Sequence, residues 1–168
     1  MLHYEHSALA EGYQNIAGID EAGRGPHAGS VLASAVILPN AFLQGDLPVA
    51  WDGLNDSKKL SPKKRDYFFA LLTEQPDCHI GIGEADAKEI DAINILQATY
   101  CAMRRAVENL PSAPDFLLVD GRPVPLLPKP SENIIKGDSK SLSIAAASVM
   151  AKVTRDLQIK EADRLYPQ

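Results

Sequence analysis

The sequence predicts an α/β fold, in which a central mixed β-sheet is flanked by α-helices. Short apolar, β-branched segments alternate with longer segments of helical periodicity, and glycine or proline separates most of them. The 168 residues are 45% hydrophobic, which is enough for one substantial core. We therefore expect residues 1–168 to form a single domain.

Two strands are expected near the N-terminus. Residues 15–20 (NIAGID) are apolar and stop at AGRG, where two glycines break the pattern. Residues 29–38 (GSVLASAVIL) are small and β-branched, which is typical of a strand buried on both faces. Residues 40–54 carry a proline and scattered Gly and Asp, so we expect a surface connection, in which Trp51 could equally cover the core.

Two helices and a strand follow. Ser61 and Pro62 form a helix start signal, and apolar residues continue at helical spacing until a proline ends the helix. Residues 78–84 (CHIGIGE) alternate as a strand does, and Asp86 can cap a long helix that runs to about Leu110. The apolar positions expected to face the core from this second helix are Ile90, Ile93, Leu96, Tyr100, Met103 and Val107.

The C-terminal part is expected to add two short strands and a last helix. FLLV, at residues 116–119, is a fully apolar strand that delivers Asp120 at its end. The proline-rich GRPVPLLPKP cannot be regular, and a short NII strand then leads into KGDS. A final helix begins at Ser141. Its predicted core side carries Leu142, Ala146, Val149, Val153 and Leu157.

Composition and charge restrict the classes of partner. The net charge of -5 gives no global attraction to nucleic acid or anionic membranes, so a polyanion must be held by local cations or bound metal. No apolar run approaches the roughly 20 residues of a membrane span, and the start lacks the pattern of a signal peptide. We expect a cytoplasmic protein. Cys78 and Cys101 match no metal-ligand spacing, which favours reduced thiols in or near the core.

Four carboxylates are the strongest candidates for chemistry. Asp20 and Glu21 close one apolar strand, Asp120 closes another, and Asp138 lies just ahead of a helix. Ligands bind at strand ends in open α/β sheets, and carboxylates that meet there repel one another unless a divalent cation shares them. Because these motifs contain no His or Cys, the oxygen ligands favour Mg²⁺ or Mn²⁺.

Two considerations weigh against that site. Neighbouring side chains on an ideal strand point to opposite faces, so Asp20 and Glu21 can share a site only if the strand bends or ends there, which the following AGRG allows. The same residues also admit a purely structural interpretation. In it, Asp20 lies in a turn, Asp120 starts an Asp-Gly turn and Asp138 caps a helix.

Glycines and cations near the carboxylates are candidates for substrate contacts. Gly23 and Gly25 would let the backbone approach a ligand closely, while Arg24 between them could meet a phosphate or stay solvated. Lys58 and Lys59 open a cluster of five cations that ends at residue 65. A second set near the KGDS segment comprises Lys136, Lys140, Lys152 and Arg155. Each set is either a solubilising face or a phosphate-binding surface, and nearness to the carboxylates favours phosphate contacts.

Several blocks resemble bacterial ribonuclease HII. In chain order they are GIDEAGRGP (18–26), AVILP (35–39), LNDSKKLSPKKR (54–65), INILQATYCAMRRAV (93–107), VDG (119–121) and IIKGDSKSLSIAAASVMAKVTRD (134–156). The resemblance spans nearly the whole chain from about residue 15. It implies a ribonuclease H-like fold and an endonuclease that hydrolyses the RNA strand of RNA/DNA hybrids and incises 5′ to ribonucleotides embedded in duplex DNA.

The resemblance also implies roles for the candidate residues. Carried over by motif, the four carboxylates are the metal ligands and catalytic residues of a two-metal reaction with Mn²⁺ or Mg²⁺, which leaves 5′-phosphate and 3′-hydroxyl ends. The segment Gly23–Gly25 senses the 2′-hydroxyl, the group that distinguishes RNA from DNA. The implied partners are nucleic-acid duplexes, and we expect a monomer without membrane association.

The chain departs from the family pattern at two places. GRGPHAGS stands where the family usually has GRGPLAGP, so His27 and Ser30 could alter the rigidity of the sensing loop. The chain stops at LYPQ, where the family continues through YGF and HKGY, whose tyrosine stacks next to the junction. Tyr166 does not take that role. We therefore expect a catalytic domain truncated at its C-terminus, with poorer discrimination of junctions.

Two other functions stay open at the level of sequence. One is a module that binds RNA/DNA junctions with weak or no turnover, because the C-terminal segment is missing. The other, which ignores the resemblance, is a Mg²⁺-dependent phosphohydrolase of small phosphates. The second would need a closed pocket around the carboxylates.

Overall fold

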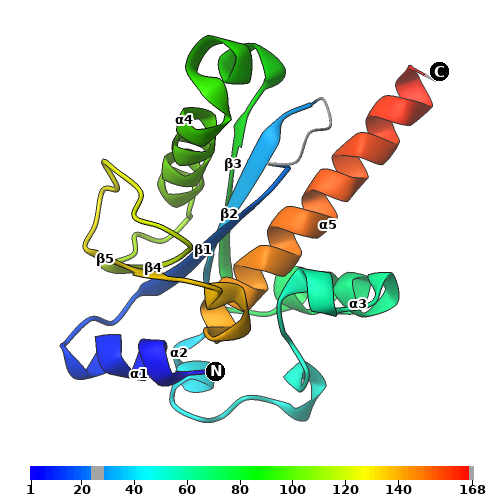
Figure 1. Cartoon of the computed structure of the whole chain (residues 1–168). Coiled ribbons are helices and arrows are strands. Elements are labelled where there is room, and N and C mark those ends of the chain that lie inside the picture. Colours follow the sequence, from blue (N-terminus) through cyan, green and yellow to red (C-terminus); the bar gives the residue numbers. More distant parts are fainter. Residues whose placement is uncertain (24–28, 167–168) are drawn as a thin grey trace.

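The computed structural model of the chain describes residues 1–23 and 29–166, and it contains one five-stranded mixed sheet (Figure 1). The strand order is β3-β2-β1-β4-β5. The middle strand β1 pairs antiparallel with β2 and parallel with β4, and the edges are β3, antiparallel to β2, and β5, parallel to β4. The bounds are Ile16–Ala22 (β1), Val31–Ile37 (β2), His79–Ala85 (β3), Phe116–Asp120 (β4) and Ser131–Ile134 (β5).

The long helices α4 and α5 cover opposite faces of this sheet (Figure 1). The α-helices are His3–Ala10 (α1), Asn40–Leu43 (α2), Pro62–Glu74 (α3), Ala87–Glu108 (α4) and Leu142–Leu165 (α5). Side chains of β1 alternate between the two faces, so Ile16 joins the core under α5 and Ile19 joins the core under α4. The sheet layered between helices is the predicted architecture.

Glycine lets both helices lie directly on the sheet. A Cβ at Gly18 of β1 would collide with the backbone of Ser143 in α5, and a Cβ at Gly83 of β3 would collide with the backbone of Ala102 in α4. Close packing therefore fixes where the first turn of α5 crosses the central strand. That turn follows directly on the KGDS segment.

The predicted helix starts are confirmed. Ser61 Oγ accepts a hydrogen bond from the Lys64 N–H at 3.2 Å, which caps α3. Asp86 and Glu89 form a reciprocal capping box at the start of α4. Ser141 caps α5. Local polar signals therefore set these boundaries correctly.

Three predictions about the core and the connections are wrong. The connection 40–54 is not plain surface, because it holds α2 and buries Phe42 and Leu43. Trp51 is 2% exposed, so it covers the core, which is one of the two places expected for it. Within α4, Ile93 and Leu96 are 38% and 40% exposed, because Asn94 leaves helical geometry (φ 71°) and turns the first part of the helix away. Leu157 is half exposed, because it lines a surface cavity with Pro62 and Arg65 at the start of α3.

The two cysteines are free and partly buried. Burial raises the pKa of the Cys78 thiol to about 12, which keeps it protonated at neutral pH. This agrees with reduced thiols near the core. Among the described helices, none combines the length and apolar character that crossing a bilayer requires.

Candidate functional site

Three of the four predicted carboxylates meet beside the ends of β1 and β4. Asp20, Glu21 and Asp120 each place one oxygen within 4.8 Å of the others. Strand β1 pairs with β4 only as far as Ile19, which lies opposite Val119. Beyond that pair the edge of β1 is open toward β4, so side chains from both strands converge there.

The open edge also explains how Asp20 and Glu21 can share one site, although neighbouring side chains on a strand point to opposite faces. The strand does not end at Asp20, since β1 continues to Ala22 in register with β2. By alternation, Asp20 starts from the face under α5 and Glu21 from the face under α4. The Asp20 carboxylate bends toward its own backbone, where Oδ1 accepts a hydrogen bond from the N–H of the next residue, Glu21, at 2.8 Å. Both carboxylates thus reach the same edge from different faces.

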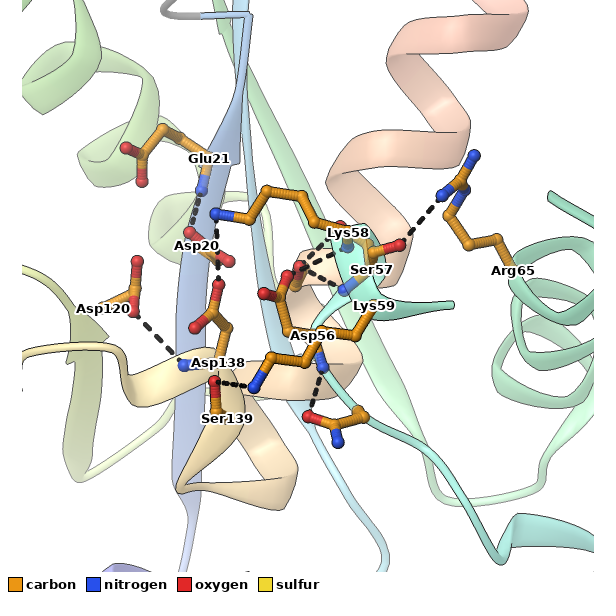
Figure 2. Close-up of polar contacts among 12 residues, drawn as sticks. Asp20, Glu21, Asp56, Ser57, Lys58, Lys59, Arg65, Asp120, Asp138 and Ser139 are labelled. Atoms are coloured by element: carbon orange, nitrogen blue, oxygen red, sulfur yellow. Dashed lines mark hydrogen bonds and ion pairs between the residues drawn. The ribbon is translucent and has the colours of Figure 1, made fainter. Parts of the chain in front are cut away.

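Asp138 lies next to this cluster, in the short 3₁₀ turn Gly137–Ser139 (η3) between β5 and α5. Its N–H donates to Asp120 Oδ1 at 3.2 Å, and its Oδ2 lies 3.8 Å from Lys58 Nζ. The left-handed conformation of Lys136 (φ 56°) reverses the chain at the start of this turn. Figure 2 shows Asp138 between Asp120 and the segment that carries Lys58.

The electrostatics of the cluster favour a bound cation. Burial raises the pKa of Asp20 well above its usual range, and the charges of Glu21, Asp120 and Asp138 raise it further. The pKa of Asp138 is raised to about 6 by burial and by the charges of Asp120 and Asp56. Ionising all of these groups together is unfavourable, and an oxygen-only donor set suits a hard divalent cation. The residues present therefore fit the predicted Mg²⁺ or Mn²⁺.

Lys58 and Lys59 belong to the 3₁₀ turn Ser57–Lys59 (η2), which lies beside the η3 turn that carries Asp138. The Lys58 side chain extends over the cluster toward Asp138 and is 77% exposed (Figure 2). Lys59 Nζ donates to Ser139 Oγ at 3.3 Å. Both candidate lysines therefore stand at the rim of the carboxylates, where a phosphate could reach them.

Asp56 belongs to this site, and the sequence analysis missed it. It is 5% exposed, and its Oδ1 accepts from the Lys58 N–H at 3.0 Å, which caps the η2 turn. The negative charge of Asp56 is the largest cause of the raised pKa of Lys58. An Asp two residues before a lysine at a turn is a recognisable cap, so the signal was present in LNDSKKL.

The second predicted set of cations does not form one patch. Lys152 pairs with Asp156 at 3.0 Å within α5, while Arg155 is only 8% exposed. Arg155 instead packs beside Gly23 and Gly29. A Cβ at Gly23 would collide with the Arg155 side chain, and one at Gly29 would lie 3.6 Å from an Arg155 guanidinium nitrogen. The backbone of Gly23 is itself in the left-handed region (φ 95°). The predictions for Arg24, Gly25 and His27 lie outside the described residues.

A cavity of about 500 Å³ opens beside Glu21 and Asp120, between the end of β4 and α4. Its rim includes Leu96 and Ile135, which are 40% and 58% exposed. Solvent therefore reaches Glu21 and Asp120 on this side, while Asp20 stays buried. The closed pocket that a phosphohydrolase of small phosphates would need is not found beside the described carboxylates.

Comparison with known proteins identifies close relatives. The family model described as Ribonuclease HII matches residues 17–167. Ribonuclease HII of Geobacter sulfurreducens is 58% identical over 165 residues, which cover 98% of this chain and 72% of that protein. The ribonuclease H2 structure from Pyrococcus horikoshii OT3 has a TM-score of 0.77 at 26% identity and covers 92% of this chain and 78% of the other.

A more distant structure, Bst-RNase HIII in complex with Mn²⁺, has a TM-score of 0.70 at 16% identity. The match covers 95% of this chain and 57% of that one. At this identity the likeness concerns the fold alone. The solved structures confirm the ribonuclease H-like fold that the sequence predicts.

Proposed function

The chain belongs to the ribonuclease HII family, and on that premise we propose that it incises duplex DNA 5′ to embedded ribonucleotides as well as cleaving the RNA strand of hybrids. Family membership makes it an RNase H-type endoribonuclease that acts on RNA/DNA hybrids. The proposal adds the junction substrate and the 5′-phosphate and 3′-hydroxyl ends. It also takes Asp20, Glu21, Asp120 and Asp138 as the catalytic residues.

The convergence of the carboxylates carries this proposal. All four carboxylates would hold Mg²⁺ or Mn²⁺ together. Asp20, Glu21 and Asp120 place oxygens within 4.8 Å of one another, and the N–H of Asp138 donates to Asp120 at 3.2 Å. The metal-dependence of the family agrees with this donor set. Divalent cations bound there supply activation of the attacking water and stabilisation of the leaving 3′-oxygen.

The neighbouring residues would bind and orient the substrate. Lys58 and Lys59 place two cations at the rim of the carboxylates, where they would neutralise backbone phosphates of the duplex. Asp56 fixes the backbone of Lys58 by capping its turn. The absence of a side chain at Gly23 leaves room for Arg155. By the family resemblance, Gly23, Arg24 and Gly25 would sense the 2′-hydroxyl.

We further propose that residues 1–168 form one catalytic domain that acts as a monomer in the cytoplasm. One sheet carries Asp20, Glu21 and Asp120, and the turn that contains Asp138 connects β5 to α5. One sheet, with a core on each face, therefore positions every proposed ligand. The family identity favours an active enzyme over a binding module without turnover.

A cleavage assay tests the proposal. Two labelled duplexes, an RNA/DNA hybrid and a DNA duplex with one ribonucleotide, are incubated with the protein in Mn²⁺, Mg²⁺ or a chelator. Metal-dependent incision 5′ to the ribonucleotide is expected, with product ends mapped by phosphatase and ligase treatment. An all-DNA duplex and Asp46→Asn, an exposed loop carboxylate, serve as controls. Binding without metal-dependent cleavage would favour the junction-binding alternative instead.

A further inference from the structure

Glu5 of α1 is a buried carboxylate far from the acidic cluster in sequence. Its side chain is fully buried, and Oε2 accepts two hydrogen bonds, from Ser141 Oγ at 2.8 Å and from the Ser143 N–H at 2.9 Å. Within the described residues, Oε1 has no hydrogen-bond partner. Burying a carboxylate is costly unless its contacts compensate, so these two bonds define what holds Glu5 in place.

Both partners of Glu5 lie at the start of α5. The first N–H groups of a helix have no partner within the helix, and their partial positive charge favours a carboxylate. Here the Met1 carbonyl accepts from the Leu142 N–H at 2.7 Å, Glu5 accepts from Ser143, and Ser141 Oγ accepts from the Ile144 N–H at 3.2 Å. The N-terminal segment thus satisfies two of these three donors.

The first turn of α5 is coupled directly to the turn that carries Asp138. The N–H groups of Lys140 and Ser141 both donate to the Gly137 carbonyl, at 2.9 and 2.8 Å. Ser141 therefore joins the η3 turn through its backbone and Glu5 through its hydroxyl. On its other side, the same helix turn packs against Gly18 of β1. Glu5 and β1 together hold the start of α5 from two directions.

We propose that Glu5 is a positioning residue for Asp138, which it fixes through Ser141 and the first turn of α5. This inference rests on the proposed function of the carboxylate site. It makes α1 a support of the metal site, although the contacts of Glu5 are with α5 and not with the other carboxylates. The important property of Glu5 is one acceptor oxygen that serves two donors.

Substitutions at Glu5 separate positioning from simple packing. Glu5→Ala leaves the Ser141 hydroxyl and the Ser143 N–H without their acceptor, so the turn that carries Asp138 can shift. Glu5→Gln keeps an acceptor oxygen and should rescue the function. The matched control is Ala8→Gly, since Ala8 is also buried in α1 (3% exposed) and its loss weakens the helix without touching α5 by hydrogen bonds.

The experiment measures melting temperature, Mn²⁺ affinity by direct titration, and kcat and KM on an RNA/DNA hybrid for the full chain and each variant. Loss of an outer support of a metal ligand typically costs 10–100-fold, so Glu5→Ala should raise the Mn²⁺ dissociation constant by about tenfold or more. It should lower kcat at a fixed Mn²⁺ concentration with little change in KM. Ala8→Gly should lower the melting temperature and leave Mn²⁺ affinity unchanged.

Equal Mn²⁺ affinities for Glu5→Ala and Ala8→Gly would overturn the positioning role, as would a failure of Glu5→Gln to rescue. If Glu5→Ala does not fold, Ser141→Ala takes its place, and a weakened Mn²⁺ affinity is again expected. An unchanged affinity in that variant also overturns the proposal. If the wild type binds Mn²⁺ but cleaves no duplex, the proposed function fails while the titration still decides the role of Glu5.

Discussion

The two faces of the sheet are built differently. The core under α4 is almost wholly apolar, and the buried polar residue described there, Thr99, donates only to the Ile95 carbonyl of its own helix at 2.7 Å. The face under α5 and its surroundings hold the remaining buried polar residues of the described chain. These are Glu5, Asp20, Ser34, Asp56, Ser57, Asp138, Ser141, Ser143, Ser148 and Arg155.

This difference separates two physical tasks. Apolar burial stabilises the fold but is not directional, so the α4 face tolerates small rearrangements of equal volume. Buried hydrogen bonds are directional and costly to leave unmade, so they fix where backbone and side chains lie. The α5 face therefore fixes Asp20 and the turn that carries Asp138, while Glu21 reaches the site from the α4 face. Changes on the two faces should separate into effects on stability alone and effects on the site.

The largest expected effect comes from Asp20→Asn on the α5 face. Removing a proposed metal ligand should lower cleavage by at least about a hundredfold. The apoprotein should become more stable at pH 7, because one charge of the crowded carboxylates is gone. Val107→Ala on the α4 face, at a buried residue that does not line the cavity beside Glu21, should lower the melting temperature and leave the cleavage rate unchanged. Melting curves with and without Mn²⁺, together with cleavage rates, provide the measurement. If Mn²⁺ raised the melting temperature of Asp20→Asn as much as that of the wild type, the ligand role of Asp20 would be contradicted.

The two glycines under the helices give the most direct comparison. Gly18→Ala and Gly83→Ala each force a helix away from the sheet and should each lower the free energy of unfolding by about 1–3 kcal/mol. Only Gly18→Ala displaces the start of α5 and should also weaken Mn²⁺ binding. Denaturant unfolding and Mn²⁺ titration of both variants would show this. Equal loss of metal affinity in both would mean that the faces do not differ in this respect.

Gly23→Ala probes the segment beside Arg155. The backbone of Gly23 is in the left-handed region, and the added Cβ would collide with the Arg155 side chain. A displacement of about 1 Å at a reacting group can lower the rate on the order of a hundredfold. Cleavage of a ribonucleotide-containing duplex should fall by roughly tenfold or more, while Mn²⁺ still stabilises the protein. Gly12→Ala is the control, with similar left-handed geometry (φ 102°) and open space around it. Similar losses in both variants would point to backbone strain alone.

A smaller effect is expected from the lysines at the rim. Replacing Lys58 and Lys59 by Ala should weaken duplex binding. The slope of the logarithm of affinity against the logarithm of salt concentration should become less steep by about one unit for each lost phosphate contact. Folding should be unaffected, because the Lys58 side chain is mostly exposed. Lys63→Ala with Lys64→Ala, two exposed cations of α3, provides the matched control. A salt slope equal to that of the wild type after the change at Lys58 and Lys59 would assign these two lysines to solubility.

The smallest effect concerns pH. A carboxylate whose folded pKa is raised binds more protons in the native state, so this group lowers stability as pH rises. For Asp138 the loss extends from about pH 4, the unfolded value, to about pH 6 in the metal-free protein. Melting temperatures should fall by a few degrees across this window, and saturating Mn²⁺ should remove the fall. A flat profile without metal would show that the carboxylates are less crowded than described.

Local signals in the sequence predict the site better than they predict the connections. Strand ends and helix caps are short-range features, and they place Asp20, Asp120 and Asp138 at chain positions that the fold then brings together. The way Asp20 and Glu21 share one edge could not be predicted. It depends on β4 pairing with β1 only up to Ile19, which is a property of the sheet register.

Long-range contacts explain what the sequence analysis missed. The helix α1 has no apolar periodicity of its own, and its place depends on partners such as Ser141, more than a hundred residues later. In α4, the irregular residue Asn94 breaks a periodicity that looks continuous in sequence, so Ile93 and Leu96 face solvent. Asp56 carries a local cap signal, but its closeness to Asp138 comes only from the folded chain.

The parallel pairing of β1 with β4 has a consequence for folding kinetics. Ala17 pairs with Leu117, one hundred residues later, so the carboxylates stay apart until a very large loop has closed. During synthesis the metal site cannot assemble before β4 has emerged. A cation that binds only the finished site cannot accelerate this closure, so divalent metal should slow unfolding of the protein while leaving its refolding rate unchanged.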